Sequence, residues 1–401
     1  MVYSFRITYG GISATVLGQR AHFAFHLIPC HNTSVHLRQL ICLSIALCFS
    51  LALASPQVRV LLDELETGFV MQMPSAHRGY VDGAPRFSTP FGLAWPITAY
   101  GSQIYIDNTP VGRSFALEPT DGQFISWNGV QYRGALRFLA VDNKLAVINV
   151  LDIEAYLRGV VPAEMAASWP LEALKAQAVA ARTFTLSQLD ADHYYDVCAT
   201  TNCQKYEGVG AEHPGSDRAI LETAGLVVTY NGDYAQTYYH SDSGGMIASS
   251  AEVWGGQIPY LTVKRDPVGD TPHDYWEVKL SPASIAASLA SIGVSVGTVQ
   301  AVRALSYSES GRVTRAEISG SSGQTVLSGK ALRELSRNWG LKSTRFSMLG
   351  NLSAAGRGWG HGVGMSQYGA MTLAESGYNH LQILAFYYPN TALQQHVYVT
   401  R

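Results

Sequence analysis

The sequence has few charged residues and few cysteines. Lys, Arg, Asp and Glu together make up 14% of the 401 residues, and the formal net charge is −2. A nucleic-acid-binding protein needs a basic excess, so the composition argues against that class and we expect no nucleic-acid partner. The chain also lacks internal repeats and low-complexity linkers. At this length it can bury one large core or two ordinary ones.

The apolar run near the N-terminus is too short to cross a bilayer. It covers residues 40–53, fewer than the roughly 20 that a spanning helix needs. Arg38 precedes the run, and Ala-Leu-Ala at residues 52–54 follows its core, which is the pattern of a secretory signal peptide. A buried core helix is the alternative. We therefore expect a protein exported to the periplasm, cell wall or extracellular space, with translation starting near Val35 and the mature chain at Ser55.

The five cysteines divide at this cleavage site. Cys30, Cys42 and Cys48 lie in or upstream of the leader, so the mature chain keeps Cys198 and Cys203. A surviving pair in an exported protein forms a disulfide or shares a metal more often than it stays as two free thiols. With His193 nearby, three zinc ligands are available, and a disulfide between the two cysteines is the alternative.

The predicted elements favour an α+β fold. Short strands separated by Gly, Pro and Asp occupy residues 58–122, and residues 131–150 alternate like a hairpin. Strands and helices then mix without regular βα alternation. Further strands are predicted at 226–230, 235–240, 299–306 and 313–319, and helices at 154–157, from Pro170 with Ser168 as its cap, and at 281–289, 330–339, 366–376 and 381–386. We divide the chain into an upstream extension with signal peptide (1–54), a β-rich segment (55–125) and a mixed domain (126–401).

One glutamate stands among apolar residues. Glu164 lies in the segment Val-Val-Pro-Ala-Glu-Met-Ala-Ala-Ser-Trp-Pro, directly before the alanine-rich helix. Burial disfavours the charged form of a carboxyl, and a raised pKa is what an acid catalyst needs near neutral pH. The alternative is a structural ion pair with Arg158 or Lys175. Glu154 and Glu172 are weaker candidates, because they occupy a strand end and an ordinary first helical turn.

Two glycine-containing segments carry hydrogen-bonding groups. Residues 356–369 contain six glycines, which let a backbone approach a ligand closely, and His361, Gln367 and Tyr368 add polar side chains. No Lys-Ser/Thr follows, so this is not a phosphate loop. Residues 238–245 read Tyr-Tyr-His-Ser-Asp-Ser-Gly-Gly. A serine hydrolase is not indicated, because the G-x-S-x-G elbow is missing. A structural turn is the alternative for the first segment.

Together and in this order, these motifs closely resemble the SpoIID/LytB family, named for stage II sporulation protein D and an amidase enhancer. The resemblance covers about residues 131–392. It implies a SpoIID-like core and a peptidoglycan lytic transglycosylase that acts on glycan strands, preferably those stripped of stem peptides. It also implies that Glu164 protonates the oxygen between N-acetylmuramic acid (MurNAc) and N-acetylglucosamine (GlcNAc). Acting next as a base, Glu164 helps the muramic 6-hydroxyl attack C1 and leaves a 1,6-anhydro end.

The resemblance further implies a sugar groove, no required cofactor and a second possible role. One carboxyl suffices because the nucleophile belongs to the substrate, and the sequence offers no second carboxylate in an equally apolar setting. Some relatives bind zinc with two His and two Cys; Asn202 replaces the second His, which leaves His193, Cys198 and Cys203 for a structural zinc. The rival function is a non-catalytic, glycan-binding enhancer of a cell-wall amidase. The residues expected in the groove are Ser241, Ser243, Gly244, Gly245, His361, Gln367 and Tyr368.

Overall fold

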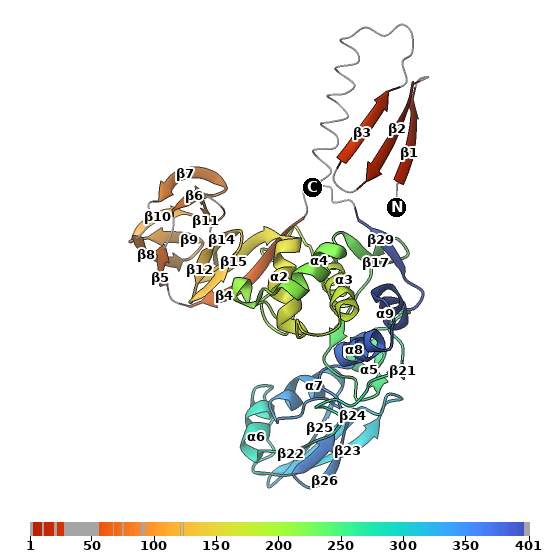
Figure 1. The fold of residues 1–401 in the computed structure, drawn as a ribbon. Helices are drawn as coiled ribbons and strands as arrows, with labels where there is room; N and C mark the ends of the chain where they lie inside the picture. The colour runs from red at the N-terminus through yellow and green to blue at the C-terminus, as the bar shows by residue number, and fades with distance from the viewer. Residues whose placement is uncertain are drawn as a thin grey trace. The chain divides into compact units, whose positions relative to one another are not determined.

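The computed structural model describes residues 3–9, 12–19, 22–27, 56–66, 68–73, 76–89, 93–120, 122 and 124–396. The chain forms two compact units, residues 1–54 with 397–401 and residues 55–396. In the first, β1 (Tyr3–Tyr9), β2 (Ile12–Gln19) and β3 (His22–Leu27) form an antiparallel sheet in that order (Figure 1). The predicted signal peptide, its cleavage site and its cysteines Cys30, Cys42 and Cys48 lie outside the described residues.

The second unit begins with a seven-stranded sheet in the order β16-β4-β15-β14-β11-β6-β7. The predicted hairpin is present, because β14 and β15 pair antiparallel and turn on Asp142 and Asn143, whose φ angles are 48° and 64°. Since β4 pairs with β15, the predicted boundary at 125/126 falls within one sheet. The strands are β4 (Gln57–Leu65), β6 (His77–Val81), β7 (Ala84–Thr89), β11 (Ser114–Pro119), β14 (Ala135–Val141), β15 (Lys144–Asp152) and β16 (Val197–Cys198).

Smaller strands accompany this sheet. A four-stranded sheet has the order β10-β9-β8-β5, and β12 pairs with β13. Their bounds are β5 (Phe69–Met73), β8 (Leu93–Tyr100), β9 (Gln103–Ile106), β10 (Thr109–Gly112), β12 (Ile125–Trp127) and β13 (Val130–Tyr132).

Helix α3 (Leu171–Ser187) is the centre of the helical part (Figure 1). Every side chain from Ala176 to Leu186 is buried, and the many alanines let neighbouring helices approach closely. Ser168 does not cap this helix: Pro170 occupies the N-cap position and no side chain accepts a hydrogen bond there. The helices in contact with α3 are α2 (Ile153–Glu164), α4 (Pro214–Glu222), α8 (Gln367–Glu375) and α9 (His380–Tyr387).

Short strands and turns connect these helices. The predicted strand at 235–240 is present only as β19 (Tyr239–His240), whose partner β28 (Met365–Ser366) is equally short. The other short elements are η1 (Gly208–Ala211), β17 (Leu226–Tyr230), β18 (Asp233–Tyr234), β20 (Met246–Ile247), α5 (Ser250–Trp254), β21 (Lys264–Arg265) and β29 (Ala392–Gln395).

Residues 276–356 form a lobe with its own hydrophobic core, called the second lobe below. It has two three-stranded sheets, β23-β24-β25 and β22-β27-β26, and two helices. Its last strand leads directly into the glycine-rich segment. The elements are β22 (Trp276–Lys279), α6 (Pro282–Ala290), β23 (Val299–Tyr307), β24 (Val313–Gly320), β25 (Gly323–Ser328), α7 (Gly329–Arg337), β26 (Phe346–Gly350) and β27 (Ser353–Gly356).

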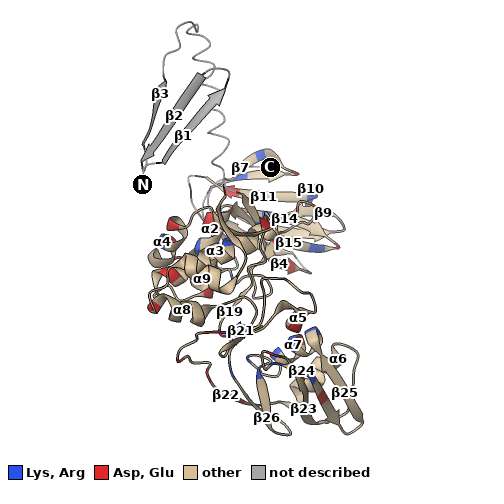
Figure 2. Cartoon of the chain, turned by 90° about the vertical axis from the view of Figure 1, so that its right-hand side faces the viewer, with Lys and Arg blue, Asp and Glu red and all other residues tan. Residues whose placement is uncertain are grey.

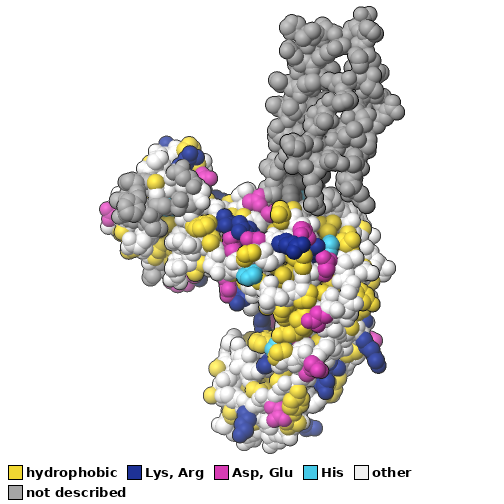
Figure 3. Space-filling model, in the orientation of Figure 1, with side chains coloured by type: hydrophobic (Ala, Val, Ile, Leu, Met, Phe, Trp, Pro, Cys, Tyr) yellow, Lys and Arg dark blue, Asp and Glu magenta, His cyan; other side chains and the backbone are white. Residues whose placement is uncertain are grey.

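The α+β prediction is confirmed, since helices and many strands mix along the described residues. Figure 2 shows basic and acidic residues interspersed along the described ribbon, and Figure 3 shows hydrophobic patches between single charged side chains. No helix in the described ranges is both long enough and apolar enough to cross a membrane.

Candidate active site

Glu164 is the last residue of α2. Asp152 caps the start of this helix by accepting from the backbone N–H groups of Glu154 (2.8 Å) and Ala155 (3.3 Å). At the other end, the Met165 N–H donates to the Val161 carbonyl at 2.9 Å. The helix therefore extends well past the short predicted one, and it holds the half-buried Glu164 in a fixed place.

The carboxylate of Glu164 has a backbone donor and forms no ion pair among the residues described. Its Oε1 accepts a hydrogen bond from the backbone N–H of Lys205 at 2.6 Å. The alternative of an ion pair with Arg158 or Lys175 is wrong, because both side chains are bound to other acids. Arg158 lies 2.7 Å from Asp217 and from Glu212, and Lys175 lies 2.8 Å from Glu172 and 2.7 Å from Glu222.

The pKa of Glu164 is raised above the ordinary value of a glutamate. Burial is the main cause, and the negative charge of Glu207 acts in the same direction. The Lys205 backbone N–H, the Gln367 amide and the Lys205 charge lower the pKa, but they do not cancel the effect of burial. The Gln367 Nε2 atom is itself buried and has no hydrogen-bond partner of standard geometry within the described part of the chain.

A buried hydrogen-bonded network lies beside the residue that contacts Glu164. Gln204, the neighbour of Lys205, donates from Nε2 to Thr185 Oγ1 at 2.7 Å and to Tyr156 Oη at 3.3 Å. Its Oε1 accepts from the hydroxyl of Tyr239 at 2.8 Å. Burial raises the pKa of both tyrosines, and the charge of Glu164 adds to the effect. Both phenols therefore stay protonated and can only donate or accept neutral hydrogen bonds.

The two glycine-containing motifs meet in a parallel bridge. Strand β19 pairs with β28, with Tyr239 opposite Met365 and His240 opposite Ser366. Gly364 has φ of +73°, and a Cβ at this position would overlap the carbonyl of Tyr238, so a side chain is excluded there. This close pairing places Gln367, the first residue of α8, next to the Glu164 carboxylate.

The serine-glycine turn lies partly beneath the surface. Ser243 is fully buried, donates to Asp266 at 2.6 Å and accepts from the Gly245 N–H at 3.0 Å. Gly244, which is also buried, has φ of +68°, and its N–H donates to Asp242 at 2.6 Å. Ser241 is half-buried, and its carbonyl accepts from the Tyr368 N–H at 3.1 Å. Contact of these residues with a sugar stays a prediction.

His361 packs against a second histidine. Its ring centre is 5.3 Å from that of His240, and its Nδ1 accepts from the Val363 N–H at 3.0 Å, which places the proton of the neutral ring on Nε2. Burial lowers the pKa of both rings, that of His240 to about 3. Both are therefore neutral at physiological pH. Sugar binding by His361 stays a prediction.

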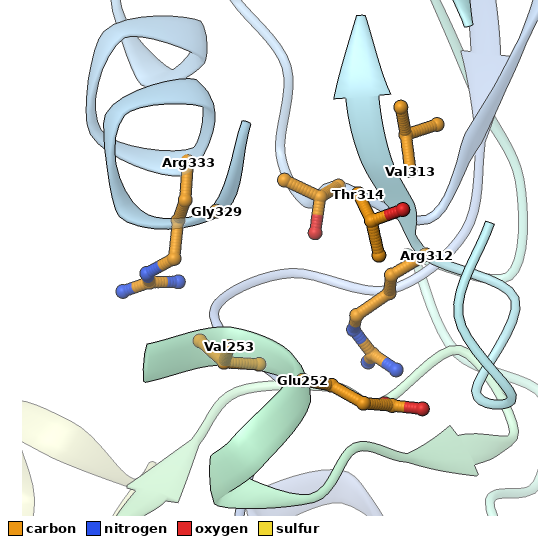
Figure 4. Close-up of a pocket in the computed structure, with 8 residues that line it drawn as sticks. Glu252, Val253, Arg312, Val313, Thr314, Gly329 and Arg333 are labelled. Atoms are coloured by element: carbon orange, nitrogen blue, oxygen red, sulfur yellow. The ribbon is translucent and has the colours of Figure 1, made fainter. Parts of the chain in front are cut away.

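The second lobe supports the serine-glycine turn through Arg312. This buried guanidinium donates to the carbonyls of Met246 at 2.9 Å and Ser243 at 3.1 Å. It also lines a small pocket together with Glu252 and Arg333 (Figure 4). That pocket shares no lining residue with the surroundings of Glu164 named above.

Comparison with known proteins identifies the family of this chain. A family model described as Stage II sporulation protein matches residues 141–230, and one described as a domain of unknown function (DUF8618) matches residues 270–364, which include the whole second lobe. Stage II sporulation protein D of Bacillus subtilis is 30% identical over 62% of this chain and 76% of its own length. This chain belongs to the SpoIID/LytB family.

Two further relatives extend the match. An uncharacterized protein of Brachyspira hyodysenteriae is 32% identical over 68% of this chain and 74% of its own length. The amidase enhancer of Bacillus subtilis is 32% identical over 70% of this chain, but the match covers only 47% of the enhancer. Membership of the SpoIID/LytB family supports a role related to the cell wall.

In this SpoIID/LytB protein the cysteine pair is a disulfide. Cys198 and Cys203 are bonded, with their Cα atoms 5.4 Å apart, and His193 Nδ1 lies 3.0 Å from the Tyr195 carbonyl oxygen. Because the disulfide leaves no thiolate, these residues do not fit a zinc site in this state. No group of three or more His, Cys, Asp or Glu side chains that could hold a metal occurs in the part of the chain that is described.

Sequence reasoning missed the groups that act on Glu164 from the segment after the disulfide. The donor from Lys205 is a backbone N–H, which no residue type signals. Gln204 is a lone glutamine between Cys203 and Lys205, with no motif around it. The disulfide itself is the available signal, because a closed loop ending at residue 203 indicates a fixed backbone immediately after it.

Proposed function

We propose that this chain is an exported peptidoglycan lytic transglycosylase in which Glu164 is the single general acid and base. The observation that carries the proposal is the half-buried Glu164 carboxyl, which has a raised pKa, accepts from the Lys205 backbone N–H at 2.6 Å and forms no ion pair within the described ranges. A carboxyl in this setting keeps its proton closer to neutral pH, and can then transfer it to a substrate oxygen.

In the proposed reaction Glu164 first donates a proton and then accepts one. Glu164 first donates its proton to the oxygen that bridges C1 of MurNAc and GlcNAc, and the C1–O bond breaks. The Glu164 carboxylate then accepts the proton of the muramic 6-hydroxyl while that oxygen bonds to C1. The products are a 1,6-anhydro-MurNAc end and a GlcNAc end with a free hydroxyl. The Lys205 N–H stabilises the carboxylate between the two steps.

The reaction needs no second carboxylate. Glycosidases that use water generally employ two acids on opposite sides of the bond. Glu207, whose charge reaches Glu164, is exposed and its carboxylate lies 2.6 Å from the ammonium of Lys205. A paired, solvated carboxylate is a poor general base, so Glu207 is the natural control for the single-acid mechanism.

The remaining assignments belong to the same proposal. Glycan strands, preferably stripped of stem peptides, are the substrate, and residues 126–401 are the catalytic domain. The substrate groove includes the serine-glycine turn and the glycine-rich segment, with Ser241, Ser243, Gly244, Gly245, His361, Gln367 and Tyr368. The reaction requires no cofactor.

A second candidate function is glycan binding that enhances a cell-wall amidase. The relative named amidase enhancer matches over 70% of this chain, and this observation favours the alternative. In that case Glu164 supports the fold of the site, and its replacement leaves glycan binding and amidase stimulation unchanged.

One experiment separates the possibilities. Glycan strands freed of stem peptides are incubated with the parent protein, with Glu164→Gln and with the control Glu207→Gln, and the products are analysed by mass spectrometry. The proposal predicts anhydro ends, lighter by one water than hydrolysed ends, from the parent and from Glu207→Gln but not from Glu164→Gln. Hydrolysed ends indicate a muramidase. No cleavage by the parent, together with stimulation of an amidase, supports the enhancer function. Cleavage by Glu164→Gln refutes the catalytic assignment.

A further inference from the structure

Four aromatic rings from distant parts of the sequence form a continuous row beside the Glu164 site. The row consists of Trp169, Tyr368, His273 and Trp359, and we call it the aromatic row. Ring centres are 4.8 Å apart for Trp169 and Tyr368, 5.5 Å for Tyr368 and His273, and 4.8 Å for His273 and Trp359.

One end of the row lies at the candidate active site. Trp169 is in the short loop that connects Glu164, at the end of α2, to α3. Tyr368 directly follows Gln367, whose amide acts on the Glu164 carboxyl. The other end is at the second lobe, because the backbone N–H of Gly360, next to Trp359, donates to the carbonyl of Lys342 at 2.9 Å.

The row offers a surface suited to sugar rings. Trp359 is 49% exposed, and Trp169 and Tyr368 are half-buried, so apolar ring surface is available to a ligand. Exposed aromatic surface next to polar groups is typical of a binding groove, and the C–H face of a pyranose packs on such rings. His273 is 8% exposed, and its Nδ1 is buried without a hydrogen-bond partner among the described atoms. Burial and the nearby Lys342 charge lower the pKa of His273, so its ring is neutral.

The far end of the row is basic. The ammonium of Lys342 lies 5.1 Å from the ring centre of Trp359. Arg357, two residues from Trp359 in sequence, is exposed, and its charge lowers the pKa of Arg345. No ion pair within the described ranges involves these three cations. The nearby acid Asp242 is buried and accepts from the Gly244 N–H and the Thr271 hydroxyl. This end therefore suits a ligand that carries an anionic group.

We propose that the aromatic row is an extended sugar-binding platform, and that Lys342 at its end binds the free lactyl carboxylate of a muramic acid unit. This proposal rests on the proposed function, from which it takes peptidoglycan strands as the ligand. It adds that the strand extends from Glu164 over Tyr368 to Trp359, while the buried His273 packs between these two rings. A stem peptide converts the lactyl carboxylate into an amide and removes its charge. The platform thus distinguishes a bare muramic acid from a substituted one and from GlcNAc.

Binding is measured by isothermal titration with the full chain carrying Glu164→Gln, so that cleavage does not interfere. The probes are glycan oligosaccharides freed of stem peptides and chitin oligosaccharides of equal length, which have no carboxylate. Trp359→Ala is expected to weaken binding of both probes roughly tenfold, and Trp359→Phe to restore much of it. Lys342→Gln is expected to weaken only the binding of the carboxylate-bearing strands, by roughly fivefold. Tyr307→Ala, an exposed aromatic of β23 outside the row, is the matched control and leaves both affinities unchanged.

The outcomes decide the proposal. Affinities of Trp359→Ala within about twofold of the parent for both probes overturn the platform. An undiminished preference for carboxylate-bearing strands in Lys342→Gln overturns the role of Lys342. Failure of the proposed function gives a different result: the parent makes no anhydro ends, while binding still depends on Trp359. Conversely, if the parent makes anhydro ends but binding does not depend on Trp359, the platform is refuted and the proposed enzymatic function stands.

Discussion

Removal of the Cys198–Cys203 disulfide is expected to loosen the backbone donor of Glu164. The bond closes a loop that ends directly before Gln204 and Lys205, and the Lys205 N–H donates to Glu164 at 2.6 Å. In the double variant Cys198→Ser/Cys203→Ser, this segment keeps only its noncovalent contacts. These include the backbone bond from Tyr206 N–H to the Ala199 carbonyl, at 3.2 Å.

The size of the effect follows from the length of the loop. For a loop this short, chain-entropy arguments give about 2 kcal/mol of stabilisation from the cross-link. If all of this stabilisation opposes local opening of the segment, the population of the opened segment rises by up to about 30-fold in the double variant. The fold as a whole should persist, because Tyr206 also donates from its hydroxyl to Asn149 at 2.8 Å and Glu207 N–H donates to the Gly159 carbonyl at 3.2 Å.

The assay is amide hydrogen exchange, combined with turnover of glycan strands. The Lys205 amide should exchange up to about 30-fold faster in the double variant, and kcat should fall by no more than the same factor. The amide of Val228, which donates to the Thr183 hydroxyl at 3.0 Å in the core, is the internal control and should exchange at the parent rate. Unchanged exchange at Lys205 would refute the argument that the disulfide holds the donor in place.

Three further predictions concern charge and protonation. Glu154→Gln breaks the bidentate ion pair with the fully buried Arg182 (2.7 and 2.8 Å) and should lower the unfolding free energy, measured by urea denaturation, by about 3–5 kcal/mol. A decrease below about 1 kcal/mol contradicts the importance of this pair. Gln367→Met removes an amide that lowers the pKa of Glu164, so the alkaline limb of the kcat/KM profile should move to higher pH; a downward move counts against the assignment. The buried His240 is neutral in the fold, with a pKa of about 3 against an ordinary histidine pKa of 6.5, so the fold loses stability as the pH falls below 6.5. By pH 5 the loss in unfolding free energy is about 2 kcal/mol. His240→Asn should therefore show a smaller difference in unfolding free energy between pH 7 and pH 5.

Local signals in the sequence predicted most helices but not all of their ends. Helices α6, α8 and α9 occur where apolar spacing and bounding residues indicated them. Helix α2 extends beyond the predicted 154–157 and continues through Pro162 to Glu164. The strand expected at 235–240 is short because its partner β28 has only two residues, and a strand is only as long as its pairing.

The contacts around the site depend on residues far apart in sequence. The donor to Glu164 lies 41 residues downstream, and backbone N–H groups of all residues look alike in a sequence. His273 joins the aromatic row from a segment without a motif, and its carbonyl accepts from the Gly358 N–H of the glycine-rich segment at 2.8 Å. Sequence motifs therefore identified the candidate acid, while its surroundings required the fold.

The two glutamates of α2 show how position determines the state of a carboxyl. Glu154 is in the first turn, where the helix dipole favours negative charge, and it binds Arg182 through both oxygens. Glu164 is at the opposite end, where the helix dipole disfavours a negative charge, and burial adds to this effect. A guanidinium at Glu164 would hold the carboxylate ionised and prevent proton donation. The Lys205 N–H, the Gln367 amide and the more distant Lys205 charge stabilise the anion enough for it to form, but burial leaves it able to take the proton back. An acid that must also act as a base requires both properties.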